Sequence, residues 1–309
     1  MGATAFEIAP VRNILSKPDR LGVMFAFLAA FGFSFKAIFV KLAYATAPVD
    51  AVTLLTLRMV FCLPFVMVAC VPVLRGMPRL SRRDVGMLLL LGGIGYYGSS
   101  MLDFYGLQYI SAGLERLILF TYPTLTILIG VLFLGKPAER SIMLAAMLSY
   151  AGIAIAFVHD ASQSSDVHSV ALGAGFVFGC AVLYALYSAG SEVAIKRLGA
   201  MRFSLLSILV ATAAVALHFL LSRPWQQLLL PAPVYGYSLG MALFSTILPI
   251  VWQSLAIRHI GAARAVLIGM LGPVLTIFFG WWLLHEAVSL SQLAGTVLVI
   301  SGVLLASRR

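Results

Sequence analysis

The chain has 309 residues, of which 61% are hydrophobic and only 10% are charged, and its mean hydropathy is +1.02. Soluble domains carry about 25% charged residues, so this composition excludes a soluble protein and predicts an integral membrane protein. The net charge of +10 would suit a nucleic-acid partner, but the positions of the basic residues give it a different explanation.

Ten apolar segments follow one another along the chain, each long enough to supply the roughly 20 residues that a helix needs to cross a bilayer. Transmembrane strands are a poor alternative because they alternate polar and apolar residues, and these segments do not. The predicted spans are residues 20–45, 48–73, 84–109, 111–134, 139–158, 170–196, 201–222, 232–259, 261–284 and 288–307. The connections are short, so we expect residues 1–309 to form a single membrane domain.

The second half of the chain repeats the first at an offset of 150 residues. Pro123 corresponds to Pro273 and Gly152 to Gly302, whereas near the start of each half the offset becomes 151. Residues 20–158 and 170–307 would then be two repeats of five helices each. An odd number of spans forces the repeats into opposite orientations, and inverted repeats are typical of secondary transporters whose substrate site lies near the midplane.

The basic residues are distributed very unevenly between the predicted loops. If the N-terminus is cytoplasmic, sixteen lysines and arginines lie on the inner side, and only Arg223 lies in an outer loop. This positive-inside bias predicts that both termini are cytoplasmic. Topology therefore explains the net charge, and no nucleic-acid partner is expected.

Several ionisable residues lie within the predicted spans, where each costs roughly 2.5–3.5 kcal/mol on insertion scales and is a functional candidate. One group lies at a similar depth near the outer face and is expected to form an ion-pair network in an outer gate or upper cavity wall: Lys41, Asp103, Glu115 and Arg116. The alternative is that these are interfacial charges that extend to the lipid headgroups.

The inner face offers a possible counterpart to this network. Glu192 corresponds to Lys41 through the repeat, and Arg264 lies near the same inner face. We expect these two residues to pair as an inner gate, since alternating access requires a closure on either side of the substrate site.

Lys36 and Arg58 are the deepest charges. Lys36 is the better candidate to face a central cavity and to bind a substrate carboxylate. Arg58 either lines the cavity as well or anchors helices by binding backbone carbonyls.

Four spans carry stripes of polar and aromatic residues that would line a cavity for an amphipathic small molecule. The alternative is that these tyrosines and tryptophans pack between helices. The candidate residues are Tyr96, Ser99 and Asp103 in the third span, Glu115 and Tyr122 in the fourth, Tyr184 and Tyr187 in the sixth, and Trp252 and Gln253 in the eighth.

Motifs of enzymes and metal sites are absent from the sequence. It has no phosphate-binding Gly-Lys-Ser/Thr loop, and its five histidines show no metal-ligand spacing. The cysteines Cys62, Cys70 and Cys180 lie inside predicted spans and are interpreted as small packing residues. We therefore expect no cofactor, no metal and no enzymatic activity.

Short motifs in both halves resemble the drug/metabolite transporter superfamily, EamA-like group. The segment Phe31-Gly32-Phe33-Ser34-Phe35-Lys36-Ala37 resembles its opening motif, and Ser111-Ala112-Gly113 and Ile260-Gly261-Ala262-Ala263 match the starts of spans four and nine. The mid-span prolines and the closing Gly302-Val303-Leu304-Leu305 also match. Where the family usually has Gly-Glu after spans four and nine, this chain has Gly135-Lys136 and His285-Glu286.

The resemblance implies ten helices in two inverted halves and export of small metabolites, often amino acids. We therefore expect an inner-membrane secondary transporter that exports or facilitates amino acids and similar amphipathic metabolites by alternating access. Asp103 and Glu115 would either bind an ammonium group or carry a coupling proton. The alternatives are a multidrug or nucleotide-sugar-type carrier and a membrane-embedded enzyme. The exact substrate, energy coupling, net direction and oligomeric state stay open.

Overall fold

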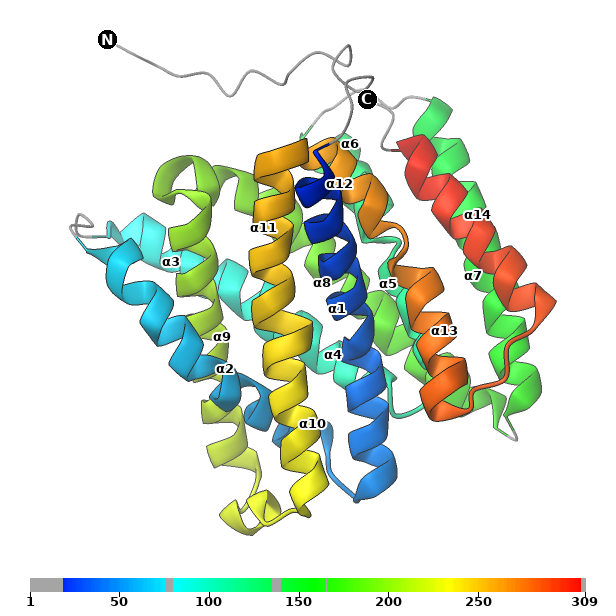
Figure 1. Ribbon diagram of the computed structural model, residues 1–309, viewed down its shortest axis with the longest axis horizontal. Helices are drawn as coiled ribbons and strands as arrows, with labels where there is room; N and C mark the ends of the chain where they lie inside the picture. Colours follow the sequence, from blue (N-terminus) through cyan, green and yellow to red (C-terminus); the bar gives the residue numbers. More distant parts are fainter. Residues whose placement is uncertain (1–18, 76–79, 135–139, 165, 307–309) are drawn as a thin grey trace.

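The computed structural model describes residues 19–75, 80–134, 140–164 and 166–306, and every regular element in this part of the chain is helical. Figure 1 shows the helices packed side by side as one bundle. The elements are α1 Arg20–Thr46, α2 Ala51–Leu74, α3 Arg82–Gly92, η2 Gly93–Gly98, α4 Ser99–Gly106, α5 Ala112–Leu119, α6 Tyr122–Leu134, α7 Arg140–Gln163, α8 Val167–Leu198, α9 Ala200–Ser222, η3 Trp225–Leu228, α10 Ala232–Ala242, η4 Leu243–Ile247, α11 Leu248–Ile260, α12 Ala262–Gly269, α13 Gly272–Leu284 and α14 Leu290–Ala306.

These elements match the ten predicted spans in order, and the all-helical membrane fold with two five-helix repeats is confirmed. Within the described residues, nine helical stretches are long and apolar enough to cross a bilayer, and α14 supplies a shorter tenth. The fifth span continues to Gln163 rather than ending at residue 158. The connection between the two repeats is correspondingly shorter than the sequence indicates.

The repeat also appears in local geometry at the same offset of 150 residues. The third and eighth spans each contain a π-helical segment, η2 at Gly93–Gly98 and η4 at Leu243–Ile247. Such segments place one extra residue in a turn and are frequent at functional sites. The extra residue rotates the helical positions that follow it about the helix axis. In both repeats, the side chains of this span therefore point in a new direction after the π-helical segment.

The fourth and ninth spans are broken at equivalent places as well. The break between α5 and α6 falls at residues 120–121, and that between α12 and α13 falls at residues 270–271. Pro123 and Pro273 lie in the first turn of the segment after each break, where a missing N–H costs no helical hydrogen bond. A proline in the middle of a span is expected to kink the helix. In each repeat the structure has a two-residue turn just before the proline.

The fifth and tenth spans, α7 and α14, pack closely against each other along one edge of the bundle (Figure 1). A Cβ built on Gly152 would lie 2.5 Å from the Gly295 carbonyl oxygen, and one built on Gly302 would lie 2.6 Å from the Ala145 carbonyl oxygen. Only glycine permits such an approach between two backbones, which is a common way for membrane helices to associate.

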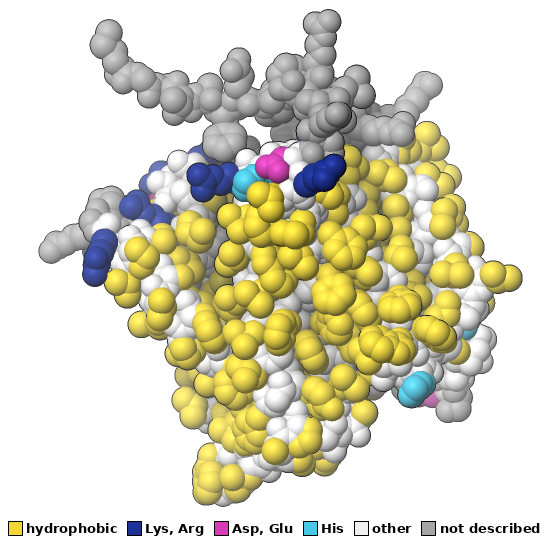
Figure 2. Space-filling view, viewed as in Figure 1, with side chains coloured by type: hydrophobic (Ala, Val, Ile, Leu, Met, Phe, Trp, Pro, Cys, Tyr) yellow, Lys and Arg dark blue, Asp and Glu magenta, His cyan; other side chains and the backbone are white. Residues whose placement is uncertain are grey.

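Apolar and charged side chains occupy separate parts of the surface, as expected of a membrane protein. Large apolar side chains such as Val68 and Leu221 are 74% and 79% exposed. Figure 2 shows hydrophobic side chains over most of one face and lysine and arginine side chains gathered along its upper edge. α1 begins and α14 ends on that same side (Figure 1). Which side faces the cytoplasm stays a prediction from the positive-inside bias.

Candidate functional site

A charged cluster lies inside the bundle where α1, α4 and α5 meet. Lys36 Nζ lies 2.7 Å from Asp103 Oδ2 and 2.9 Å from Glu115 Oε1, and it donates a hydrogen bond to the latter. The side chains of Asp103 and Glu115 are 3% and 0% exposed, whereas that of Lys36 is 15% exposed. Ionised groups are expensive in a membrane interior unless they are paired, and here the Lys36 ammonium group is paired with both carboxylates.

Local structure explains how the two carboxylates reach Lys36. Asp103 lies on α4, which follows directly from the π-helical segment η2. Glu115 lies in the first turn of α5, whose N-cap residue Ser111 accepts a hydrogen bond from the Leu114 amide at 3.0 Å. This cap fixes the start of α5 and thereby the depth of Glu115 in the membrane.

The cluster is incompletely satisfied. Asp103 Oδ1 and Glu115 Oε2 are buried and have no hydrogen-bond partner among the described residues. One ammonium group contacts two carboxylates, so the cluster has more hydrogen-bond acceptors than donors. If both acids are ionised, the cluster also has a net negative charge. A cation, an ammonium group or a proton would complete it.

Arg116 follows Glu115 on α5 but is oriented differently. Its Nε atom is buried without a partner, and its guanidinium carbon lies 5.3 Å from the ring centroid of Phe120. Asp103 and Glu115 are within its electrostatic range, as are Tyr122 and Tyr184. The residue as a whole is half-buried.

Four of the predicted tyrosines are brought together beside these charges. The ring centroids of Tyr122 and Tyr184 are 4.8 Å apart, those of Tyr96 and Tyr187 are 5.4 Å apart, and those of Tyr184 and Tyr187 are 5.8 Å apart. η2, α6 and α8 contribute the rings, so both repeats build this tyrosine cluster. Its polar edges and aromatic faces suit an amphipathic molecule.

Other predicted residues lie elsewhere. Lys41 donates to the Ile110 carbonyl oxygen at 2.9 Å, so Lys36 and not Lys41 is the cation that contacts the two buried carboxylates. The Ser99 hydroxyl donates to the Gly95 carbonyl within its own helix. Trp252 and Gln253 are half-buried on α11, which packs against α1.

Two further predictions have different outcomes. Arg58 donates to the Thr246 hydroxyl from Nε at 3.3 Å and from Nη2 at 3.2 Å, and so links α2 to the π-helical segment η4. Its anchoring role thus uses a hydroxyl instead of backbone carbonyls. The side chain of Glu192 lies outside the described residues, so its pairing with Arg264 stays a prediction.

Two carboxylates that sequence reasoning did not select hold the N-terminus of α5. The Ser111 amide donates to Asp160 Oδ2 at 2.9 Å, and the Ala112 amide donates to Glu286 Oε1 at 3.0 Å. Asp160 lies in the last turn of α7, and Glu286 lies in the connection between α13 and α14. Negative groups are favourable at a helix N-terminus, where amides have no partner in the helix.

The same region contains the Lys41 bond and one more link, which complete what we call the α5 clamp: Lys41, Ser111, Ala112, Asp160 and Glu286, with His159. The His159 ring nitrogen Nε2 lies 3.2 Å from the Ala287 carbonyl oxygen. Burial above all raises the pKa of the Glu286 carboxyl above its ordinary value of 4.5. The signal in the sequence that pointed to Glu286 was the His285-Glu286 pair, which stands where the resembled family usually has Gly-Glu after span nine.

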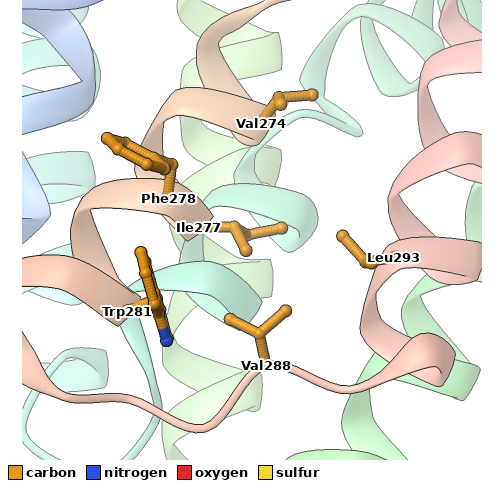
Figure 3. A pocket seen from close by; sticks show the side chains of 6 residues that line it. All are labelled: Val274, Ile277, Phe278, Trp281, Val288 and Leu293. Atoms are coloured by element: carbon orange, nitrogen blue, oxygen red, sulfur yellow. The ribbon is translucent and has the colours of Figure 1, made fainter.

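An apolar groove with a volume of about 300 Å³ lies between α13 and α14. Figure 3 shows its lining, which is formed by Val274, Ile277, Phe278, Trp281, Val288 and Leu293. Most of these side chains are well exposed, so the groove faces the lipid rather than the charged cluster. The described residues contain no group of three or more potential metal ligands.

Comparisons with known proteins agree with this architecture. The family model described as the EamA-like transporter family matches residues 20–158 and 171–308. The chain is 27% identical over 280 residues to the transporter YcbK of Bacillus subtilis, covering 89% of this chain and 88% of that protein. It is 28% identical over 288 residues to the pseudopaline exporter CntI of Pseudomonas aeruginosa, covering 93% and 96%. A solved crystal structure matches the fold with a TM-score of 0.63 at 18% identity, covering 93% of this chain and 98% of that one.

Proposed function

We propose that this chain, which belongs to the EamA-like transporter family, exports or facilitates amino acids and similar small amphipathic metabolites by alternating access. Membership establishes a multi-pass membrane transporter, and the resemblance seen in the sequence is thereby confirmed. The substrate class, the alternating-access mechanism, the direction of transport and a location in the inner membrane are parts of the proposal.

The charged cluster of Lys36, Asp103 and Glu115 is the observation that supports the proposed substrate class. A membrane protein retains such charges at a cost, and they mark substrate or ion pathways. The unpartnered oxygens of Asp103 and Glu115 are suited to an ammonium group. The tyrosine cluster beside them provides the aromatic surface that an amphipathic molecule requires.

The α5 clamp supports alternating access. Glu286 belongs to the second repeat, whereas Ala112 begins a helix of the first, so their hydrogen bond joins the two halves at one end of the bundle. Glu115 lies three residues further along the same helix and is fully buried, which supports a closed state of the cluster on that side. Opening on that side would separate the two halves at the clamp, as inverted-repeat transporters do when they rock.

Export rather than uptake is supported by the Pseudomonas aeruginosa relative, which is named a pseudopaline exporter and matches almost the whole chain. A multidrug or nucleotide-sugar-type carrier remains the rival within transport. A membrane-embedded enzyme is the rival from another class, and it would show no saturable flux.

The experiment is counterflow of labelled amino acids in liposomes that contain the purified protein, with and without an imposed pH gradient. Saturable counterflow without a gradient is the expected result for a facilitator. Flux that appears only with the gradient would assign a coupling proton to Asp103 and Glu115. Absence of flux for every amino acid, with flux of a drug or a nucleotide sugar, would overturn the proposed substrate class.

The matched control for this experiment is the Arg258→Gln variant. Arg258 is exposed near the end of α11 and distant in the chain from the charged cluster. Its substitution removes one positive charge, as a Lys36→Gln substitution does, but from the surface. Loss of flux in a Lys36→Gln variant that is still folded by its thermal unfolding transition, with flux retained in Arg258→Gln, would locate transport at the cluster.

A further inference from the structure

Three buried polar atoms of Asp103, Glu115 and Arg116 have no hydrogen-bond partner among the described residues, and their chemistry is complementary. Asp103 Oδ1 and Glu115 Oε2 are acceptors, whereas Arg116 Nε is a donor. Buried polar atoms are nearly always paired in folded proteins. Unpaired acceptors and an unpaired donor on neighbouring side chains therefore indicate a ligand that carries both a donor and an acceptor.

Lys36 is poorly placed to bind the anionic part of such a ligand. Its ammonium group already contacts two carboxylates at 2.7 and 2.9 Å. An incoming carboxylate at this point would meet two like charges in a medium of low dielectric constant, where their repulsion is strong. The expectation that Lys36 binds the substrate carboxylate therefore conflicts with the charges around it.

Arg116 has the surroundings that a carboxylate needs. Within the described residues it has no ion pair, and the Phe120 ring lies beside its guanidinium group. A Cβ built on Gly272 would lie 2.9 Å from Arg116 Nη2, so the guanidinium group rests on bare backbone. Gly272 is the first residue of α13, whose N-terminal end carries a partial positive charge. The Arg116 guanidinium group and the N-terminal end of α13 thus lie close together without an anion between them.

We propose that the transported molecule is a zwitterion whose carboxylate binds Arg116 and whose ammonium group binds the free oxygens of Asp103 and Glu115. The proposal rests on the proposed function and assigns the anionic contact to Arg116 instead of Lys36. Lys36 is then a positioning residue that holds the two acids. The planar guanidinium group suits bidentate binding of a carboxylate.

One small molecule could contact both kinds of charge. Asp103 and Glu115 lie within electrostatic range of Arg116, and an α-amino acid carries its ammonium and carboxylate groups close together. Tyr122 and Tyr184 lie within electrostatic range of Arg116 and offer their rings to the apolar part of the molecule. A molecule with only one of the two charges would leave part of this site unpaired.

The test compares an amino acid with two derivatives in proteoliposome counterflow. The twenty common amino acids are first screened, and the one with the fastest flux is compared with its amide, which lacks the carboxylate, and its N-acetyl form, which lacks the ammonium group. In the wild type, both derivatives should have a KM at least about tenfold higher than the amino acid, because sites built for a polar group reject analogues that lack it.

The Arg116→Gln variant should raise the KM of the amino acid about tenfold or more and bring it to within about twofold of that of the amide, a loss of roughly 1.4 kcal/mol of discrimination. Its discrimination against the N-acetyl form should persist. The Arg258→Gln variant should retain both preferences. If the Gln variant does not fold, Arg116→Lys replaces it: a higher KM for the amino acid alone supports the proposal, and an equal rise for amino acid and amide overturns it.

These measurements distinguish failure of the proposed function from failure of the proposed role of Arg116. No flux of any amino acid in the wild type would overturn the proposed function and this inference together. Flux without discrimination between amino acid and amide, or discrimination that persists in the Arg116→Gln variant, would overturn the inference and leave the transporter of amphipathic metabolites intact.

Discussion

Glu286, in the connection that precedes the last helix, accepts a hydrogen bond from the backbone amide of Ala112 at 3.0 Å, 174 positions earlier in the chain. A carboxylate of the second repeat thereby caps a helix of the first. That helix carries Glu115 and Arg116, so a movement of Glu286 relative to α5 would be transmitted directly to the charged cluster.

The pH dependence of stability should reveal Glu286. Burial raises the pKa of its carboxyl in the folded protein above 4.5, so the folded state binds this proton more tightly than the unfolded state does. The stability from this group is fully present below pH 4.5 and is lost as pH rises through the folded pKa. We expect the Tm of the wild type, measured relative to the Glu286→Gln variant in detergent, to fall as pH rises from about 4.5 towards neutral pH.

The groups that face Glu286 are Lys41 on α1, His159 and Asp160 on α7, and the α5 amides. A parallel titration of the Asp166→Asn variant, which removes a carboxylate at the start of α8, is the control. A Tm difference between wild type and Glu286→Gln that stays constant over this range would contradict the prediction.

Removal of Lys36 should destabilise the protein strongly. The Lys36→Gln variant leaves Asp103 and Glu115 buried without their shared cation, and breaking a buried ion pair from one side costs about 3–5 kcal/mol. Addition of Glu115→Gln to this variant should restore part of the loss, since one buried charge is then removed. Thermal unfolding of the two single variants and the double variant forms a double-mutant cycle. Additive losses would show that Lys36 does not stabilise the acid.

The contact between α7 and α14 should not tolerate a side chain at Gly152. A methyl group there would meet the Gly295 carbonyl oxygen at 2.5 Å, so Gly152→Ala should cost about 1–3 kcal/mol through separation of the two helices. Gly175, where a Cβ would contact nothing within 4 Å, provides the control, and Gly175→Ala should leave stability nearly unchanged. Equal Tm values for the two variants would refute the packing argument.

The start of α2 should depend on Asp50. Its side chain accepts hydrogen bonds from the Val52 amide at 3.0 Å and the Thr53 amide at 3.3 Å. Burial raises the pKa of Asp50, but hydrogen bonds from Thr53 and Arg223 outweigh it, and the net pKa is lowered. The Asp50→Ala variant should lose about 1 kcal/mol at neutral pH. Because the pKa is lowered, this difference should shrink as pH falls below 3.8.

The role of Arg223 can be tested beside it. Arg223 Nε donates to Asp50 Oδ1 at 3.1 Å, and both side chains are about one third exposed. Exposed pairs are worth at most about 1 kcal/mol, so Arg223→Gln should cost less than Asp50→Ala. The opposite order in Tm measurements would show that the ion pair, rather than the helix cap, stabilises this corner.

Sequence patterns were sufficient for the large features of this protein. Runs of apolar residues long enough to cross a bilayer predicted the helices, because hydrocarbon requires every backbone group to be bonded within its own segment. The offset that relates Pro123 to Pro273 also marked equivalent places in the two repeats, and the breaks before α6 and α13 lie next to these prolines. These features depend on composition and spacing along one helix, which a sequence displays directly.

The pairing of charges depended on the tertiary structure. Lys36 and Lys41 lie on the same helix, and hydropathy alone could not show that Lys36 contacts Asp103 and Glu115 while Lys41 binds the Ile110 carbonyl. The partners of a charge are chosen by helix rotation, by the π-helical segment before Asp103, and by contacts between segments far apart in the chain. Glu286 shows this best, because its partner Ala112 is adjacent only once both repeats have folded and packed together.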